Sequence, residues 1–211
     1  MSSTARAAFV KVWDPFVRVF HWLVAAGFVV AYVSEGEPMW LHSWTGYLIA
    51  VLLLLRLVWG FVGPRTARFV DFVYKPGTVV SYLLRMPVGR AKRYLGHSPA
   101  GGAMVIALML CLAGTAGTGM ALHAVRNNAG PLAGIIKAPP AEQIAPSAGD
   151  DRSRSRPRKP GRELKEVHEV LANLTLVLVF LHIGGVLIAS LSHRENLVRA
   201  MIDGRKRPLS D

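Results

Sequence analysis

Long apolar segments separated by polar, mostly basic connections dominate the pattern of this chain. Four of them stand out, at about residues 17–34, 40–62, 100–122 and 167–191. Each has about the 20 residues that a helix needs to cross a hydrocarbon core of about 30 Å. None shows the two-residue alternation of a membrane barrel strand, and only helices and closed barrels satisfy their backbone polar groups in lipid. The pattern therefore predicts an all-α fold, an integral membrane four-helix bundle.

The composition agrees with a membrane protein that forms a single domain. The chain has 211 residues, of which 52% are hydrophobic, which is high for a soluble domain. We expect a single membrane domain over residues 1–211. The connection from about 124 to 165 is rich in Pro, Ala, Ser and Arg and has almost no large apolar residues, so we expect it to be flexible.

The formal charge of +12 raises the question of a nucleic-acid partner. The basic residues fall between the apolar segments, as in loops that remain cytoplasmic, and we therefore expect no nucleic acid. The connection 65–93 and the tail after 193 are strongly basic, whereas the first connection offers only Glu35 and Glu37. This asymmetry predicts that both termini are cytoplasmic. The Arg-rich segment 152–162 disagrees, but it lies in a long connection that also contains acidic residues, and long connections carry less weight.

Histidines inside the apolar segments are the candidate chemistry. Ionisable side chains are expensive in a bilayer, so each is a functional hypothesis. His168 and His182 are 14 residues apart on one predicted helix, which places them about 21 Å apart along the axis and nearly on one face. The only cysteine, Cys111, excludes a disulfide and a thioether-linked haem.

Depth in the membrane predicts how the histidines pair. With the amino terminus inside, His21 lies in the inner leaflet and His42 in the outer one. The last helix enters from outside, so His168 is outer and His182 is inner. The predicted pairs are His42 with His168 and His21 with His182. Two facing imidazoles in a bundle core are what a six-coordinate haem b requires, which predicts two non-covalently bound haems with these residues as iron ligands.

Further residues extend the candidate site. Gly46, one turn after a ligand, leaves room for a flat ring, although small residues also serve close helix packing. Arg18 and Arg56 are candidates for neutralising haem propionates, and snorkelling to the interface explains them equally well. His193 is a candidate for bonding a propionate or a quinone head group. The remaining two histidines have no partner at the same depth and are expected to be structural, namely His97 and His123.

These motifs resemble the bacterial di-haem cytochrome b561 family, which includes the b-type subunit of membrane-bound nickel-iron hydrogenases. The resemblance rests on residues 11–22, 41–60, 96–102 and 193–201. It implies a multi-pass protein of the bacterial inner membrane that passes electrons between the quinone pool and a periplasmic redox partner. It assigns the same four ligands, namely His21, His42, His168 and His182.

The leading hypothesis is therefore an electron-transfer subunit of an oxidoreductase, with no catalytic residue of its own. Ubiquinone or menaquinone is the expected substrate, and a c-type cytochrome or a hydrogenase-like oxidoreductase is the expected partner. One alternative is a stand-alone superoxide:quinone oxidoreductase, which needs a cationic outer pocket, for example from Arg162 and Lys165. Another is a haem-free proton-relay subunit of a transporter.

Overall fold

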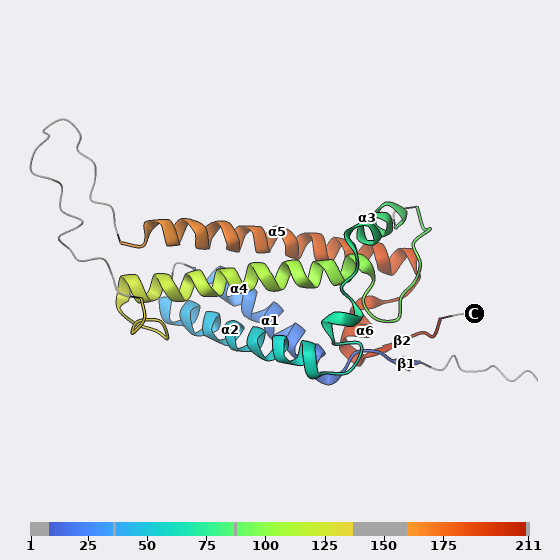
Figure 1. Cartoon of the computed structure of the whole chain (residues 1–211), viewed down its shortest axis with the longest axis horizontal. Coiled ribbons are helices and arrows are strands. Elements are labelled where there is room, and N and C mark those ends of the chain that lie inside the picture. Colours follow the sequence, from blue (N-terminus) through green and yellow to red (C-terminus); the bar gives the residue numbers. More distant parts are fainter. Residues whose placement is uncertain (1–8, 36, 87, 137–159, 210–211) are drawn as a thin grey trace, which may run out of the picture.

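Four long helices run side by side in the computed structural model of this chain (Figure 1). The structure describes residues 9–35, 37–86, 88–136 and 160–209. The long helices are α1 (Pro15–Val33), α2 (Met39–Val62), α4 (Pro99–Asn127) and α5 (Arg162–Ser192). All four are long and apolar enough to cross a membrane. The predicted all-α membrane bundle is confirmed.

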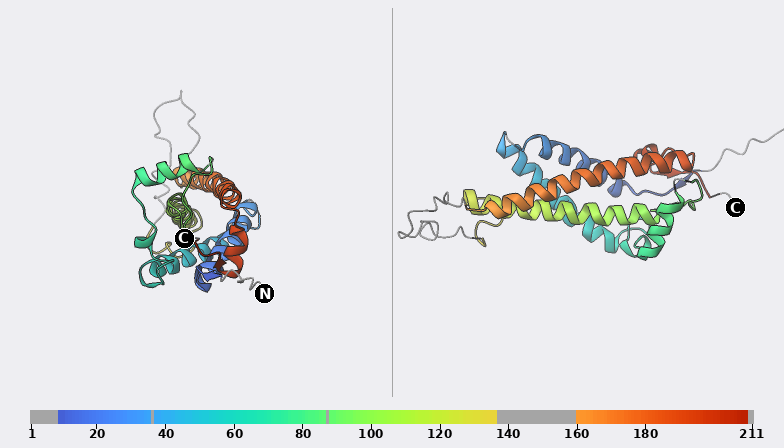
Figure 2. Two further views of the ribbon diagram at one scale, coloured as in Figure 1. Left: turned by 90° about the vertical axis from the view of Figure 1, so that its right-hand side faces the viewer. Right: turned by 90° about the horizontal axis from the view of Figure 1, so that it is seen from above.

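Smaller elements gather at one end of this bundle (Figures 1 and 2). They are β1 (Val10–Lys11), the 3-10 helix η1 (Phe69–Asp71), α3 (Pro76–Arg85), α6 (Leu197–Asp203) and β2 (Arg205–Lys206). We call this the inner end, because it carries the basic connection and the tail that are predicted to be cytoplasmic. None of these elements is apolar enough for hydropathy to reveal it.

Local capping explains where two of the long helices, α1 and α4, begin. The Asp14 side chain accepts a hydrogen bond from the Val17 N–H at 3.1 Å, and Ser98 accepts one from the Gly101 N–H at 3.2 Å. A proline follows each of these caps, at a position that has no intrahelical N–H partner to lose. Helix α4 ends at Asn127, and the C-cap residue Asn128 adopts the left-handed conformation typical of a helix end.

Two helices are longer than hydropathy predicted. Helix α4 continues to Asn127 instead of about residue 122, and α5 begins at Arg162 instead of about 167. The added turn of α5 is charged, and ion pairs one turn apart support it. These pairs join Arg162 to Glu166 and Lys165 to Glu169. Most of the Arg-rich segment lies in 137–159, outside the described residues, so its flexibility stays a prediction.

The packed core is small; its fully buried residues come from three helices, and Leu176 and Val179 of α5 pack against them. Val24 and Phe28 of α1, Ile49 and Leu52 of α2 and Leu112 of α4 form one buried cluster. Apolar side chains elsewhere on the long helices are largely exposed, as expected where lipid is the surrounding solvent. Hydrophobic contact among the helices therefore holds only part of the bundle together.

A polar clamp closes the inner end. Strands β1 and β2 pair in antiparallel fashion, with Val10 opposite Lys206, which brings the two ends of the described chain together. Glu195 accepts hydrogen bonds from the Arg93 guanidinium at 2.7 Å and from the Arg207 N–H at 3.0 Å. Burial alone would raise the pKa of Glu195, but these donors and Lys206 lower it below its ordinary value. That this end faces the cytoplasm stays a prediction.

We expect Glu195→Gln to lower the free energy of unfolding by about 2 kcal/mol, because it leaves Arg93 and the buried Lys206 without their anionic partner. Chemical unfolding of the detergent-solubilised protein measures this loss. The matched control is Glu166→Gln, which removes the same charge from an exposed pair with Arg162 and should cost less than about 0.5 kcal/mol. Equal effects of the two variants would contradict the role assigned to the clamp.

Candidate functional site

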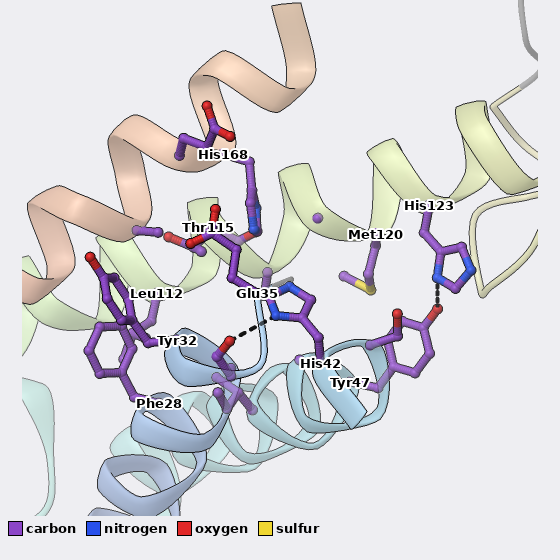
Figure 3. Close-up of a pocket in the computed structure, with 18 of the residues that line it drawn as sticks. Phe28, Tyr32, Glu35, His42, Tyr47, Leu112, Thr115, Met120, His123 and His168 are labelled. Carbon is purple, nitrogen blue, oxygen red and sulfur yellow. Dashed lines mark hydrogen bonds between the residues drawn. The ribbon is translucent and has the colours of Figure 1, made fainter. Parts of the chain in front are cut away.

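The outer pair of histidines joins α2 to α5. The rings of His42 and His168 lie with their centroids 6.0 Å apart and their planes at 74°. Both line a cavity that is also bordered by α1 and α4 (Figure 3). The structure thus brings together the two residues that were expected to share the outer leaflet.

Backbone carbonyls fix the orientation of both outer rings. The Nδ1–H of His42 donates to the Ala31 carbonyl at 2.9 Å, and that of His168 donates to the Thr115 carbonyl at 2.9 Å. A carbonyl only accepts, so each Nδ1 carries the proton and each Nε2 keeps a free lone pair. This is the arrangement by which proteins prepare histidine as a metal ligand.

The inner pair joins α1 to α5. The ring centroids of His21 and His182 are 6.2 Å apart, with an interplanar angle of 55°. Trp22 meets the His21 ring edge-on at 5.0 Å. The Nδ1 of His21 is buried and has no hydrogen-bond partner in the described part of the chain. Buried polar atoms are rarely left unpaired, so an orphan nitrogen marks a place where a partner from outside the polypeptide fits.

Both pairs have the spacing that a shared metal requires. Two metal–nitrogen bonds of about 2 Å, plus about 1 Å from each nitrogen to its ring centre, place the centroids about 6 Å apart. The observed separations are 6.0 and 6.2 Å. The donor set and the spacing therefore fit a haem iron held between two imidazoles. That these four residues are its ligands stays a prediction.

One glycine controls how closely α4 approaches the outer pair. A Cβ atom on Gly119 of α4 would lie 2.9 Å from Cε1 of His168, so only glycine lets that ring lie against α4. Gly46, which was predicted to give a flat ring room, lines the cavity and has open space beside it. The sequence reasoning missed Gly119, because α4 carries none of the four histidines and gave no signal there.

The three other predicted residues lie at the inner end. Arg18 donates to the Ile202 carbonyl at 2.6 Å, and Arg56, which is 2% exposed, donates to the Ala67 carbonyl at 3.0 Å. His193 lies 3.5 Å from the Tyr82 hydroxyl. Arg18 therefore joins α1 to α6, His193 joins the end of α5 to α3, and Arg56 joins α2 to the connection that follows it. Contacts of these residues with propionates or a quinone stay predictions.

The charges around the outer cavity bear on the superoxide alternative. Glu35 and Glu169 line the cavity, and the Tyr32 hydroxyl donates to Asn173 at 3.0 Å within it. Lys165, one of the two cations proposed for an anion pocket, is paired with Glu169. The other, Arg162, is paired with Glu166. Within the described residues, both cations proposed for the pocket are therefore ion-paired and two carboxylates line the cavity, which does not favour an anionic substrate there.

Comparison with known proteins shows which family and which protein this chain is similar to. The family described as prokaryotic cytochrome b561 matches residues 12–204. A protein of Rhizobium leguminosarum bv. viciae, named a probable Ni/Fe-hydrogenase B-type cytochrome subunit, is 27% identical over an alignment of 122 positions, and the match covers 43% of this chain. The aligned part is 49% of that relative, so the chain spans about half of its length. No solved structure gives a significant match.

His97, which was expected to be structural, lies in an aromatic cage at the inner end. Its ring centroid is 4.6 Å from that of Trp13 and 4.3 Å from that of Phe72, and its Nδ1 is buried with no hydrogen-bond partner among the described residues. Burial, together with the positive charges of Arg56 and Lys206, lowers the pKa of His97 to about 3. The ring is therefore neutral at physiological pH.

This lowered pKa predicts an acid sensitivity. In the unfolded chain His97 takes up a proton near its ordinary pKa of 6.5, whereas the folded chain resists protonation until about pH 3, so stability falls as the pH drops through this window. His97→Gln removes the contribution. Thermal unfolding from pH 7 to pH 4.5 should show the Tm of the wild type falling more steeply than that of the variant, and parallel curves would contradict the assignment.

Proposed function

Because this chain belongs to the prokaryotic cytochrome b561 family, and is thus a multi-pass b-type cytochrome of the bacterial inner membrane, we propose that it is a di-haem electron-transfer subunit. The observation that carries this proposal is the pair of facing imidazoles at each of two levels, with centroids 6.0 and 6.2 Å apart. A bound haem supplies an iron that cycles between the ferric and ferrous states.

The residues of the chain prepare the two sites in different ways. The Ala31 and Thr115 carbonyls hold His42 and His168 in the tautomer that leaves Nε2 free. At the inner level, His21 and His182 face each other, and His21 retains an unpartnered nitrogen. His168 and His182 are separated by 14 residues of α5, or about 21 Å of helical rise. The proposed redox centres therefore lie in opposite leaflets of the membrane.

The redox partner and the lipid-soluble substrate belong to the proposal as well. The relative is named as a hydrogenase cytochrome subunit, which supports a periplasmic oxidoreductase, or a c-type cytochrome, as the partner. A quinone, ubiquinone or menaquinone, is the proposed membrane-soluble substrate. A superoxide:quinone oxidoreductase is less well supported, because the cations proposed for its pocket are ion-paired.

We expect alanine variants to separate the two haems by level. His42→Ala and His168→Ala should each lose the outer haem, and His21→Ala and His182→Ala the inner one, so that the haem-to-protein ratio falls from about two to one. Absorbance spectra with redox titration would show which centre is missing. Partners that lose different centres would refute the pairing, and a wild type that binds no haem would favour the haem-free proton relay.

Gly119 provides a sharper test with a control on the same helix. Gly119→Ala places a Cβ atom 2.9 Å from the His168 ring, which must then move away from the Thr115 carbonyl. We expect the affinity for the outer haem to fall by about tenfold, the size of effect seen when a ligand loses its orienting contact. Gly117→Ala meets nothing within 4 Å and should retain both haems. Equal retention by both variants would argue against this site.

A further inference from the structure

Tyr47 of α2 and His123 of α4 form a polar pair that the ligand assignment does not use. The Tyr47 hydroxyl and the His123 Nδ1 are 2.9 Å apart and joined by a hydrogen bond, and the two ring planes are 6° from parallel (Figure 3). His123 was expected to be structural for lack of a partner at its depth, and its partner is a tyrosine. The Tyr47–His123 pair lines the same cavity as His42 and His168.

His123 lies one turn further out along α4 than the place where the His168 ring rests. That ring lies against Thr115 and Gly119, and His123 follows Gly119 by four residues, or about 6 Å of helical rise. A haem held by His42 and His168 carries its two propionates on one edge of the ring. An edge turned toward the end of α4 therefore brings a propionate toward His123.

The Tyr47–His123 pair has one hydrogen left over, whichever residue donates. A neutral tyrosine and a neutral histidine carry one O–H and one N–H between them, and their mutual bond uses one of these. If Tyr47 donates, the second nitrogen of His123 keeps its hydrogen; if His123 donates, the Tyr47 hydroxyl keeps its own. Either way a donor remains beside the cavity, and a carboxylate is the strongest acceptor for it.

A second polar pair lines the cavity but is less suited to a carboxylate. It consists of Tyr32 and Asn173. Among the described residues that line the cavity, the acidic ones are Glu35 and Glu169. Glu35 follows Tyr32 by three residues, and Glu169 precedes Asn173 by one turn. Negative charge therefore gathers beside this second pair, where a further carboxylate is disfavoured.

The surroundings of the Tyr47–His123 pair suit an anion better. Arg126 follows His123 by three residues, so it lies one turn further along the same side of α4. The turn after α4 covers the pair at Gly130, where φ is +88° and a Cβ would lie 2.5 Å from the Tyr47 hydroxyl oxygen. Trp44 meets the Tyr47 ring edge-on at 5.9 Å. This cover limits the access of water, which strengthens a hydrogen bond to a charged group.

We infer that the Tyr47–His123 pair binds a propionate of the outer haem and so turns the propionate edge of that haem toward the outer end. This rests on the proposed function, from which the haem is taken, and adds two positioning residues to its four ligands. The propionate edge then lies on the side where the periplasmic partner is proposed to bind, and the inner histidine pair keeps its place in the electron path.

Haem-release kinetics test this inference. The full-length, haem-loaded protein in lipid nanodiscs is mixed with excess apomyoglobin, and the release of each haem is followed by absorbance. The His42→Ala and His21→Ala variants show which kinetic phase belongs to which haem. Tyr47→Phe and His123→Leu each leave one hydrogen on the pair and should accelerate outer-haem release by about threefold or less. The double variant leaves none and should accelerate it about twentyfold, as loss of one hydrogen bond to a charged group predicts.

Reconstitution with the dimethyl ester of haem b separates propionate binding from packing. The ester carries no negative charge, so the wild type should release it from the outer site about as fast as the double variant releases haem b. The double variant should release the ester no faster than the wild type does. Tyr82→Phe, which alters the tyrosine–histidine pair at the inner end, should leave outer-haem release unchanged.

Outer-haem release that is unchanged in the double variant, or accelerated equally with haem b and with its ester, would overturn the inference, because the pair would then only pack against its neighbours. If the double variant retains no outer haem, the wild type decides, and equal release of haem b and of the ester from its outer site would overturn the inference. A wild type that binds no haem would instead overturn the proposed function.

Discussion

Every polar group that this chain carries into the bilayer must find its partner inside the protein, because lipid offers none. The Tyr32 hydroxyl donates to Asn173 on another helix, and the Thr175 hydroxyl donates to the Leu171 carbonyl one turn back on its own. Hydrophobic contact cannot replace these bonds, since lipid tails solvate apolar side chains as well as other helices do. Polar contacts and close backbone approach therefore decide which helices meet.

The histidine pairs show how this need for internal partners orients potential metal ligands. At the outer level, each ring donates a hydrogen bond from one nitrogen to a backbone carbonyl, which leaves the other nitrogen free. At the inner level the Nδ1 of His21 has no such partner, and the ring depends more on whatever lies between it and His182. The same requirement for partners thus produces a preorganised outer pair and an inner pair that a cofactor would complete.

The sequence was sufficient for those features that depend on position along a helix. Helical rise and the alternation of helix direction place His42 level with His168 and His21 level with His182, and these residues lie together in the structure. Gly119 and the Tyr47–His123 pair depend instead on how α4 approaches and how α2 crosses it (Figure 2). Tyr47 is five residues deeper along α2 than His42, so it meets His123 only because the helices are inclined, which hydropathy cannot reveal.

The described segments close the two ends of the bundle by different means. At the inner end, β1 and β2 pair, Glu195 binds the Arg93 guanidinium, and His97 contacts the rings of Trp13 and Phe72, so that segments distant in sequence meet there. At the outer end, one turn after α4 covers the Tyr47–His123 pair and leaves the tryptophans of α2 exposed beside it. Fewer of the described segments meet at the outer level, where the histidines are the more firmly oriented.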